Sequence, residues 1–262
     1  MSFVLEGIGK EYGHGASGTV ALAGVDLAAR GAEFLSIVGP SGCGKTTLLK
    51  IVAGLVAPSS GRITFDATRA PGKLRTGLVF QDHGLLPWYD VLENVALGLR
   101  FQERFRRAER AAALERARQF IVHVGLERFL HHRPHELSIG MRQRVGIARA
   151  FVADPEILLL DEPFGSLDAQ TRVVLQQELL RIWHEHRKLV VHVTHDIDEA
   201  ILLSDRIAVM SGRPSRIREE IAVPFARPRD VSVLDSAEAR AIHRRVWNIL
   251  EEEVREGLCV PR

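Results

Sequence analysis

A short segment, Gly39-Pro-Ser-Gly-Cys-Gly-Lys-Thr-Thr47, constrains the fold of this chain more than any other feature. It follows an apolar run, Phe34–Val38, that predicts a strand, and it opens a run to Leu55 that predicts a helix. Glycines let the backbone curl so that successive N–H groups point inward, and a helix N-terminus adds partial positive charge. The pattern Gly-x-x-x-x-Gly-Lys-Thr between a strand and a helix is typical of a phosphate-binding loop.

The side chains of this loop suit a nucleotide with its metal ion. Lys45 can reach the β- and γ-phosphates, and the Thr46 hydroxyl can ligate Mg²⁺. Cys43 would contribute its backbone N–H, which leaves its thiol incidental. The residues predicted to bind the nucleotide are Gly39, Pro40, Ser41, Gly42, Cys43, Gly44, Lys45, Thr46 and Thr47. The alternative is a glycine-rich turn without a ligand.

A second acidic motif lies in Ile157-Leu-Leu-Leu-Asp161-Glu162, an apolar strand that ends in two carboxylates. Asp161 at the strand end can hold Mg²⁺, and Glu162 can orient the attacking water or accept its proton. Alone this pattern is a weak indicator of function. Following a phosphate loop in an α/β chain, it predicts the metal and water side of a hydrolytic site.

Bulk properties exclude several classes of protein. The 262 residues fit one large domain, and a net charge of +2 gives no basic footprint for nucleic acid. The two cysteines, Cys43 and Cys259, form neither a disulfide framework nor a zinc site, which indicates a reducing intracellular compartment. No signal peptide and no long apolar span is recognisable. If the protein works at a membrane, another chain must hold it there.

Apolar periodicity predicts an α/β chain. Short strand-like runs dominate the first 65 residues, a helical period begins at Val91, and strands and helices then alternate. The predicted strands are Phe3–Leu5, Val20–Leu22, Phe34–Val38, Arg62–Phe65, Leu78–Phe80, Ile157–Leu160, Leu189–Val193, Ile207–Met210 and Ile217–Val223. The predicted helices are Thr47–Leu55, Ala108–Val124, Gln143–Val152, Ala169–His186, Ile197–Leu203 and Ser236–Glu256, with Pro224–Arg229 as a connector.

From about Val4 to Met210 the chain resembles the nucleotide-binding subunits of ABC transporters. The resemblance rests on the order of the two motifs above and of several further positions, each of which alone could be an ordinary structural residue. It implies that Gln81 contacts Mg²⁺ and water, that His195 holds the γ-phosphate, and that Tyr12 stacks on adenine. The signature loop is Leu137-Ser-Ile-Gly-Met141, and Ser166-Leu-Asp168 reaches across a dimer. The implied catalytic residues are Glu162, His195, Gln81 and Lys45, the implied metal ligands are Thr46, Gln81 and Asp161, and the implied cofactors are ATP and Mg²⁺.

The resemblance also implies the architecture. A P-loop NTPase core with a mostly parallel sheet would carry an N-terminal antiparallel β subdomain and an inserted α-helical subdomain. Residues 1–262 would form a single ABC ATPase domain. Its β/α core would comprise 1–90 and 154–225, its helical subdomain 91–153, and its C-terminal extension 226–262.

One phosphate loop and one signature loop per chain imply a homodimer, in which Ser138, Gly140 and Asp168 contact the nucleotide of the opposite subunit. One departure from the family is Ile139, where glycine is usual. A β-branched residue is costly where φ must be positive. Either Ile139 adopts ordinary dihedrals and merely packs, or the ATPase is slowed or differently tuned.

The segment Gly84-Leu-Leu-Pro-Trp88 would expose apolar side chains to a transmembrane permease, unless it is a local core turn. With Val91–Val95 it resembles importers for nitrate, sulfonate or taurine, which implies a solute-binding protein in the complex. The subunit would sit on the cytoplasmic face of the inner membrane through the permease. Alternatives are another small solute, a non-transport ABC ATPase, a P-loop kinase or GTPase, and a scaffold without chemistry.

Overall fold

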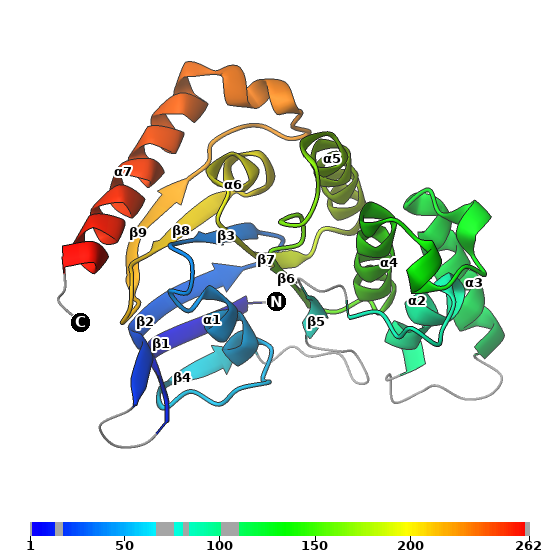
Figure 1. Ribbon diagram of the computed structural model, residues 1–262, viewed down its shortest axis with the longest axis horizontal. Helices are drawn as coiled ribbons and strands as arrows, with labels where there is room; N and C mark the ends of the chain where they lie inside the picture. The colour runs from blue at the N-terminus through cyan, green and yellow to red at the C-terminus, as the bar shows by residue number, and fades with distance from the viewer. Residues whose placement is uncertain (1, 14–17, 67–75, 81–83, 101–109, 260–262) are drawn as a thin grey trace. The chain divides into compact units, whose positions relative to one another are not determined.

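The computed structural model describes residues 2–13, 18–66, 76–80, 84–100 and 110–259. They fall into two compact units, one drawn from residues 1–67 and 187–262 and the other from 68–186. Figure 1 follows the elements along the chain by colour. The predicted site residue Gln81 and the arginine-rich run 104–107, for which we expect a solvated helix face, lie outside the described residues.

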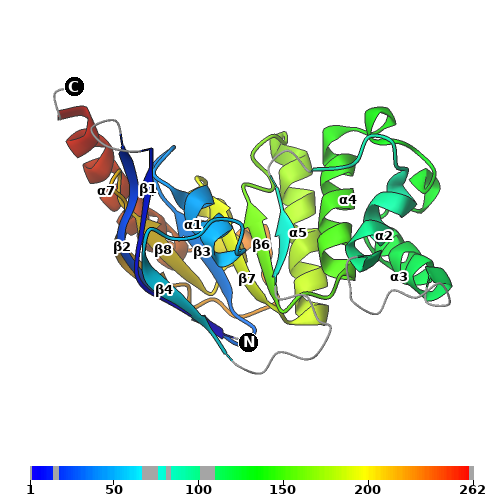
Figure 2. The ribbon, with the colours of Figure 1, turned by 90° about the horizontal axis from the view of Figure 1, so that it is seen from below.

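An antiparallel sheet opens the first unit, in the order β2 (Thr19–Arg30), β1 (Ser2–Tyr12) and β4 (Ser60–Phe65). Figure 2 shows these strands as one curved layer. β1 is longer than the predicted strand, because Gly7 takes a positive φ of 58° and the pairing continues past it with shifted register. A Cβ on Gly61 would lie 2.3 Å from the Gly7 carbonyl oxygen, so this close crossing requires glycine.

The parallel strands of the first unit are β3 (Phe34–Val38), β7 (Leu189–Thr194) and β8 (Arg206–Met210), and β9 (Ile217–Ala222) pairs antiparallel with β8. β3 and β7 are buried along their whole length, as parallel strands covered on both faces are. Helix α1 (Lys45–Val52) follows β3, and α6 (Ile197–Leu203) follows β7. Helix α1 starts earlier than predicted. It also ends earlier, because Gly54 takes a φ of 73° just beyond its C-cap.

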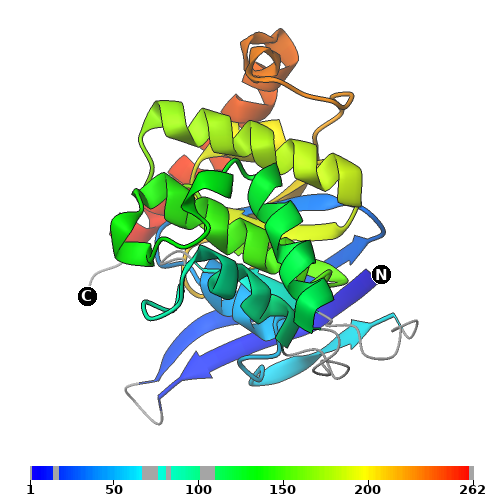
Figure 3. The same cartoon turned by 90° about the vertical axis from the view of Figure 1, so that its right-hand side faces the viewer.

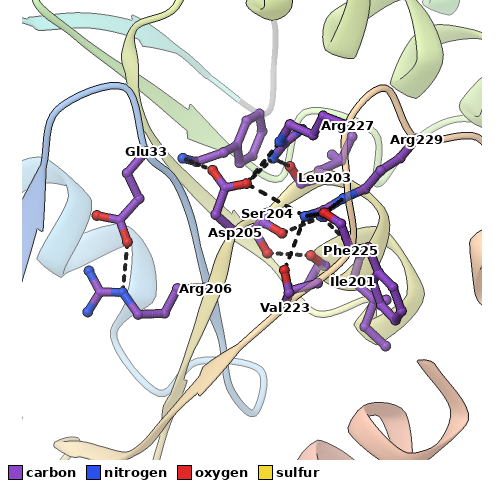
Figure 4. A network of polar contacts seen from close by, with 12 residues as sticks. Glu33, Ile201, Leu203, Ser204, Asp205, Arg206, Val223, Phe225, Arg227 and Arg229 are labelled. Atoms are coloured by element: carbon purple, nitrogen blue, oxygen red, sulfur yellow. Dashed lines mark hydrogen bonds and ion pairs between the residues drawn. The ribbon is translucent and has the colours of Figure 1, made fainter. Parts of the chain in front are cut away.

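The C-terminal segment closes the core of the first unit. After the 3₁₀ turn η5 (Val231–Asp235), the long helix α7 (Ala237–Cys259) buries Ile242 and Val246 in a cluster with Ile201 of α6 and Val209 of β8. The predicted connector is fixed by arginines: Arg227 pairs with Asp205 at 2.8 Å, and Arg229 donates to a ring of backbone carbonyls (Figure 4). Residues beyond Gly212 are therefore an integral part of this unit.

The second unit holds the parallel pair β5 (Thr76–Val79) and β6 (Ile157–Asp161), together with most of the helices. These are α2 (Val91–Arg100), α3 (Arg110–His123), η3 (Glu127–Phe129), η4 (Pro134–Glu136), α4 (Ile139–Val152) and α5 (Ala169–His186), seen in green in Figure 3. Helices α2 and α4 approach closely at Gly98, where a Cβ would lie 2.5 Å from the Arg149 carbonyl oxygen. None of the helices within the described ranges is long and apolar enough to cross a bilayer.

The predicted α/β fold is confirmed, with its antiparallel N-terminal sheet, its mostly parallel strands and its helical insert. One boundary was wrong in a way that matters for the site. Helix α4 begins at Ile139 rather than at Gln143, because the Ser138 side chain caps it by accepting a hydrogen bond from the Met141 N–H at 3.2 Å. The signature segment is therefore the first turn of a helix rather than a loop before one.

Candidate active site

The phosphate loop between β3 and α1 contains glycines at positions where a side chain would be strained or crowded. Gly42 and Gly44 take positive φ values of 73° and 119°. A Cβ on Gly44 would lie 3.0 Å from Leu22 Cδ2, and one on Gly39 would lie 2.9 Å from Cys43 Sγ. The loop thus curls tightly over β2 and over its own Cys43.

Lys45 places a buried positive charge in this loop. The residue is 4% exposed, and its Nζ donates to the carbonyl oxygens of Gly39 at 2.8 Å and Pro40 at 3.0 Å. Among the described residues no carboxylate neutralises this ammonium. A buried cation at a helix N-terminus, with glycines that leave the backbone open, fits a polyphosphate chain.

Cys43 acts as a packing group in this loop. Its N–H donates to the Pro40 carbonyl at 3.2 Å, and its own carbonyl accepts from the Ser215 hydroxyl. Burial raises the pKa of the Cys43 thiol above its ordinary value, while nearby Lys45 opposes the shift. The thiol is therefore protonated at neutral pH and unsuited to nucleophilic work.

The sheet register brings His195 to the same edge as the phosphate loop. Val38 of β3 pairs with Thr194 of β7 in a parallel ladder, so the residues that follow, Gly39 and His195, leave adjacent strands side by side. The His195 side chain is exposed there. Tyr12, at the end of β1, points its hydroxyl at Thr47 Oγ1 at 3.5 Å. The first unit therefore gathers the phosphate loop, His195 and Tyr12.

The carboxylates of the second unit stand at the end of β6. Asp161 is buried as its last residue, and Glu162 follows with a φ of 45°, a left-handed conformation that non-glycine residues seldom adopt. Gly165 lies close to this side chain, because a Cβ there would be in ordinary contact with Glu162 Oε2 at 3.6 Å. Two successive carboxylates thus belong to the end of β6 and the turn that follows it. β5 pairs in parallel with β6, from Thr76 opposite Ile157 to Val79 opposite Leu160.

Ser138, Gly140 and Asp168 lie together at the facing ends of α4 and α5. A Cβ on Gly140 would lie 2.8 Å from Thr171 Cγ2, and the Thr171 N–H donates to Asp168 Oδ1 at 3.0 Å. That backbone hydrogen bond lowers the pKa of the Asp168 carboxyl. Two helix N-termini thus open close to each other, and both offer donors to an anion.

Ile139 has the ordinary backbone of a helical residue, because it is the first residue of α4 and is not among the residues of positive φ. That part of the prediction is confirmed. The side chain is 44% exposed, and the choice between a packing residue and a tuned ATPase stays a prediction.

An apolar groove lies beside the exposed Gly84–Trp88 turn. Trp88 is 64% exposed, and next to the turn a pocket of about 250 Å³ is lined by Gly77, Leu78, Phe80, Gly84, Leu97, Gly98, Arg149, Ala150 and Ala153. The turn is rigid because the buried Asn94 side chain accepts from the Leu86 N–H at 2.8 Å and donates to the carbonyls of Leu86, Tyr89 and Asp90. The exposure of Trp88 disfavours the alternative of a local core turn.

Three residues that support the site escaped the sequence reasoning. Asn94 holds the turn above, Arg149 Nη1 donates to the Gly84 carbonyl at 2.7 Å, and Ser215 fixes the phosphate loop from a distant segment. Asn94 left a signal, because a polar residue in the apolar Val91–Val95 helix start must find partners. The other two left none, since their partners are backbone atoms far along the chain.

Oxygen donors for a magnesium ion exist in both units. The Thr46 hydroxyl and the Asp161 carboxylate are hard ligands of the kind that Mg²⁺ prefers, alongside water and phosphate oxygens. Over the described part of the chain no group of three or more histidine, cysteine or acidic residues could hold a metal. Each of these two donors, taken by itself, fits a magnesium ion whose other ligands are water and phosphate oxygens.

Comparisons with known proteins agree with this geometry. The family model described as ABC transporter matches residues 22–165. An uncharacterised ABC transporter ATP-binding protein of Methanocaldococcus jannaschii is 47% identical over 240 residues, which cover 91% of this chain and 87% of that protein. A taurine import ATP-binding protein of Pseudomonas syringae pv. tomato is 48% identical over 225 residues, with 85% and 84% covered.

Solved structures lead to the same family. The dimeric structure of a bacterial ABC transporter cassette is 35% identical, with a TM-score of 0.74, and the match covers 86% of this chain and all of that one. A dimeric ATP-binding cassette in a post-hydrolysis state, bound to ADP and Pi, is 34% identical with a TM-score of 0.73. This chain belongs to the ABC transporter family and is one of its ATP-binding, ATP-hydrolysing proteins.

Proposed function

We propose that two copies of this chain bind ATP between them and power a membrane importer for nitrate, a sulfonate, taurine or a similar small anion. The phosphates rest on the loop from Gly39 to Thr47, where Lys45 contacts the β- and γ-phosphates and Tyr12 stacks on the adenine. The observation that carries the proposal is the buried Lys45 ammonium, whose partners among the described residues are carbonyls of its own loop.

Hydrolysis in this proposal depends on Glu162. Glu162 follows β6 with a left-handed backbone, and in this proposal its carboxylate orients and deprotonates the water that attacks the γ-phosphate. His195 follows β7, the parallel neighbour of β3, and donates a hydrogen bond to the γ-phosphate from there. Mg²⁺, held by Thr46, Asp161 and Gln81, would neutralise the charge that develops on the phosphate oxygens.

The homodimer supplies the other half of each site. The capped N-terminus of α4, with Ser138 and Gly140, and the neighbouring Asp168 face the nucleotide of the partner subunit. The Ser138 hydroxyl oxygen accepts a hydrogen bond from the Met141 N–H. The hydroxyl can still donate a hydrogen bond to a phosphate oxygen. ATP binding then closes the dimer, and hydrolysis releases it.

The groove beside Trp88 is the proposed attachment to the permease. Its apolar lining and exposed aromatic residue suit a helix from a membrane subunit, which would hold this chain on the cytoplasmic face of the inner membrane. The taurine import relatives support the anion assignment, with a solute-binding protein as a further partner. Other small solutes and a non-transport ABC ATPase remain the competing functions.

Glu162→Gln tests the mechanism. We expect the variant to bind ATP, to accumulate as an ATP-loaded dimer in light scattering, and to lose at least about 100-fold in turnover, because its amide cannot accept the proton. The matched control is Glu185→Gln on the exposed face of α5, which should behave as wild type. Normal turnover in Glu162→Gln would remove Glu162 from its role.

The cargo needs a separate experiment with the assembled complex. ATPase activity of the chain with its permease in liposomes should rise when the solute-binding protein is added with taurine or an aliphatic sulfonate. Stimulation only by a solute that carries neither a sulfonate group nor nitrate would contradict the cargo assignment, whatever Glu162 does.

A further inference from the structure

A buried polar cluster joins β3, β7 and α6, the two last of which flank the turn that carries His195. His192 on β7 is 0% exposed, and its Nδ1 is 3.0 Å from the hydroxyl oxygen of Ser36 on β3. Its Nε2 is 2.6 Å from Oε1 of Glu199 on α6, a residue that is 4% exposed. Neither side chain can reach a nucleotide from the interior, so the cluster has no direct part in the chemistry.

Packing alone does not account for this cluster. Replacing a buried ionisable pair by apolar residues of similar volume is often neutral or stabilising, because taking polar groups out of water is costly. Phe34 packs its ring edge-on to His192 with centroids 5.9 Å apart, which shows that aromatic contacts are already available here. The buried pair of His192 and Glu199 is therefore better explained by a role in fixing the backbone around it.

The geometry that the pair holds is the turn of His195. Asp196 Oδ1 accepts from the Glu199 N–H at 3.1 Å, and the Asp196 N–H donates to Thr194 Oγ1 at 3.0 Å. The contact between His192 and Glu199 then joins the strand before the turn to the helix after it. The chain is thus fastened on both sides of His195, whose own side chain is exposed.

We propose that His192 and Glu199 form a brace that positions His195 and ties its turn, through Ser36, to the strand that leads into the phosphate loop. Ser36 and His192 are cross-strand partners in the register of β3 and β7. The brace therefore fixes the distance between His195 and the γ-phosphate bound at the end of β3. It rests on the proposed role of His195, and the residues of the brace are positioning residues.

The test compares Glu199→Met, which removes the polar contact at similar volume, with Glu199→Gln, which keeps a carbonyl oxygen for His192. We expect Glu199→Met to lower kcat for ATP about 10-fold or more, because small displacements of a catalytic group are expensive, with KM changed less than about 2-fold. Glu199→Gln should stay within about 2-fold of wild type. His192→Leu is the second variant and should reproduce Glu199→Met.

The same substitutions in a His195→Ala background separate positioning from general damage. If the brace acts only through His195, Glu199→Met lowers the residual turnover of His195→Ala no further. If the losses of kcat multiply in the double variant, the brace is refuted and the role of His195 is not. Normal kcat in Glu199→Met and His192→Leu would have the same meaning. Full turnover in His195→Ala would overturn the proposed role of His195 and the brace with it. Thermal unfolding of each variant reports whether it is folded.

Discussion

Arg229 makes the C-terminal segment a fixed part of the first unit, and its removal offers a test with a calculable size. The side chain is 1% exposed, and its guanidinium donates to the carbonyl oxygens of Ile201, Ser204, Val223 and Phe225 at 2.6 to 3.2 Å (Figure 4). Burial lowers its pKa to about 10, as does neighbouring Arg227, while Asp205 opposes the shift. The side chain thus stays charged at neutral pH.

Arg229→Ala leaves these four carbonyl oxygens without their hydrogen-bond donor. At about 1 kcal/mol for each buried acceptor left without its donor, the free energy of unfolding should fall by about 4 kcal/mol. For a chain of this size that corresponds to a fall in Tm of about 10 °C. Arg229→Lys should lose about half as much, because one ammonium cannot serve four acceptors.

The assay is denaturant unfolding followed by circular dichroism, with Tm from calorimetry. Arg244→Ala is the matched control: this arginine of α7 is exposed and has no side-chain partner among the described residues, so its loss should stay within about 0.5 kcal/mol. A loss below about 1 kcal/mol in Arg229→Ala, or equal losses in both variants, would refute the reasoning.

Three further substitutions or modifications test the site. Gly44→Ala should weaken binding of a fluorescent ATP analogue about 10-fold or more, because a left-handed alanine costs about 1–2 kcal/mol and its Cβ would meet Leu22. The control is Gly31→Ala, which is also at positive φ but in open space and should bind the analogue normally. Equal binding by the two variants would contradict this prediction. In a Cys259→Ser background, Cys43 should resist iodoacetamide at pH 8 and react only on unfolding, since its raised pKa leaves little thiolate; rapid native labelling would show the thiol to be accessible. Ile139→Gly should change turnover less than about 2-fold, because a helical residue gains no relief from glycine; a large increase would assign the tuning to the exposed side chain.

The sequence predicted the order of elements well, because strands buried on both faces and amphipathic helices leave clear periodicities. The errors of the prediction concern the ends of helices and strands, which depend on polar contacts that are either local or distant along the chain. Helix α4 starts four residues early because Ser138 caps it, and β1 runs past Gly7 because β4 pairs with it across that glycine.

The candidate site was predictable where a motif lies within one stretch of chain, as in the phosphate loop and at Asp161 and Glu162. The supports were not. Arg149 reaches Gly84, and Arg229 reaches Ile201, by hydrogen bonds to backbone carbonyls, which any residue type at the receiving position provides. Such contacts leave no mark in the receiving sequence. The His192 brace was hidden for a related reason, since its three members come from separate elements.

The distant supports of the phosphate loop bear on how the protein is made. Gly39 packs against Met210, and the Ser215 hydroxyl donates to the Cys43 carbonyl while its backbone pairs with Ala21 and Ala23. A nascent chain that has left the ribosome only as far as Thr47 carries every residue of the loop but neither support. Competence to bind nucleotide should therefore appear late in translation, once the segment through Ser215 has emerged, so that truncated products do not sequester ATP.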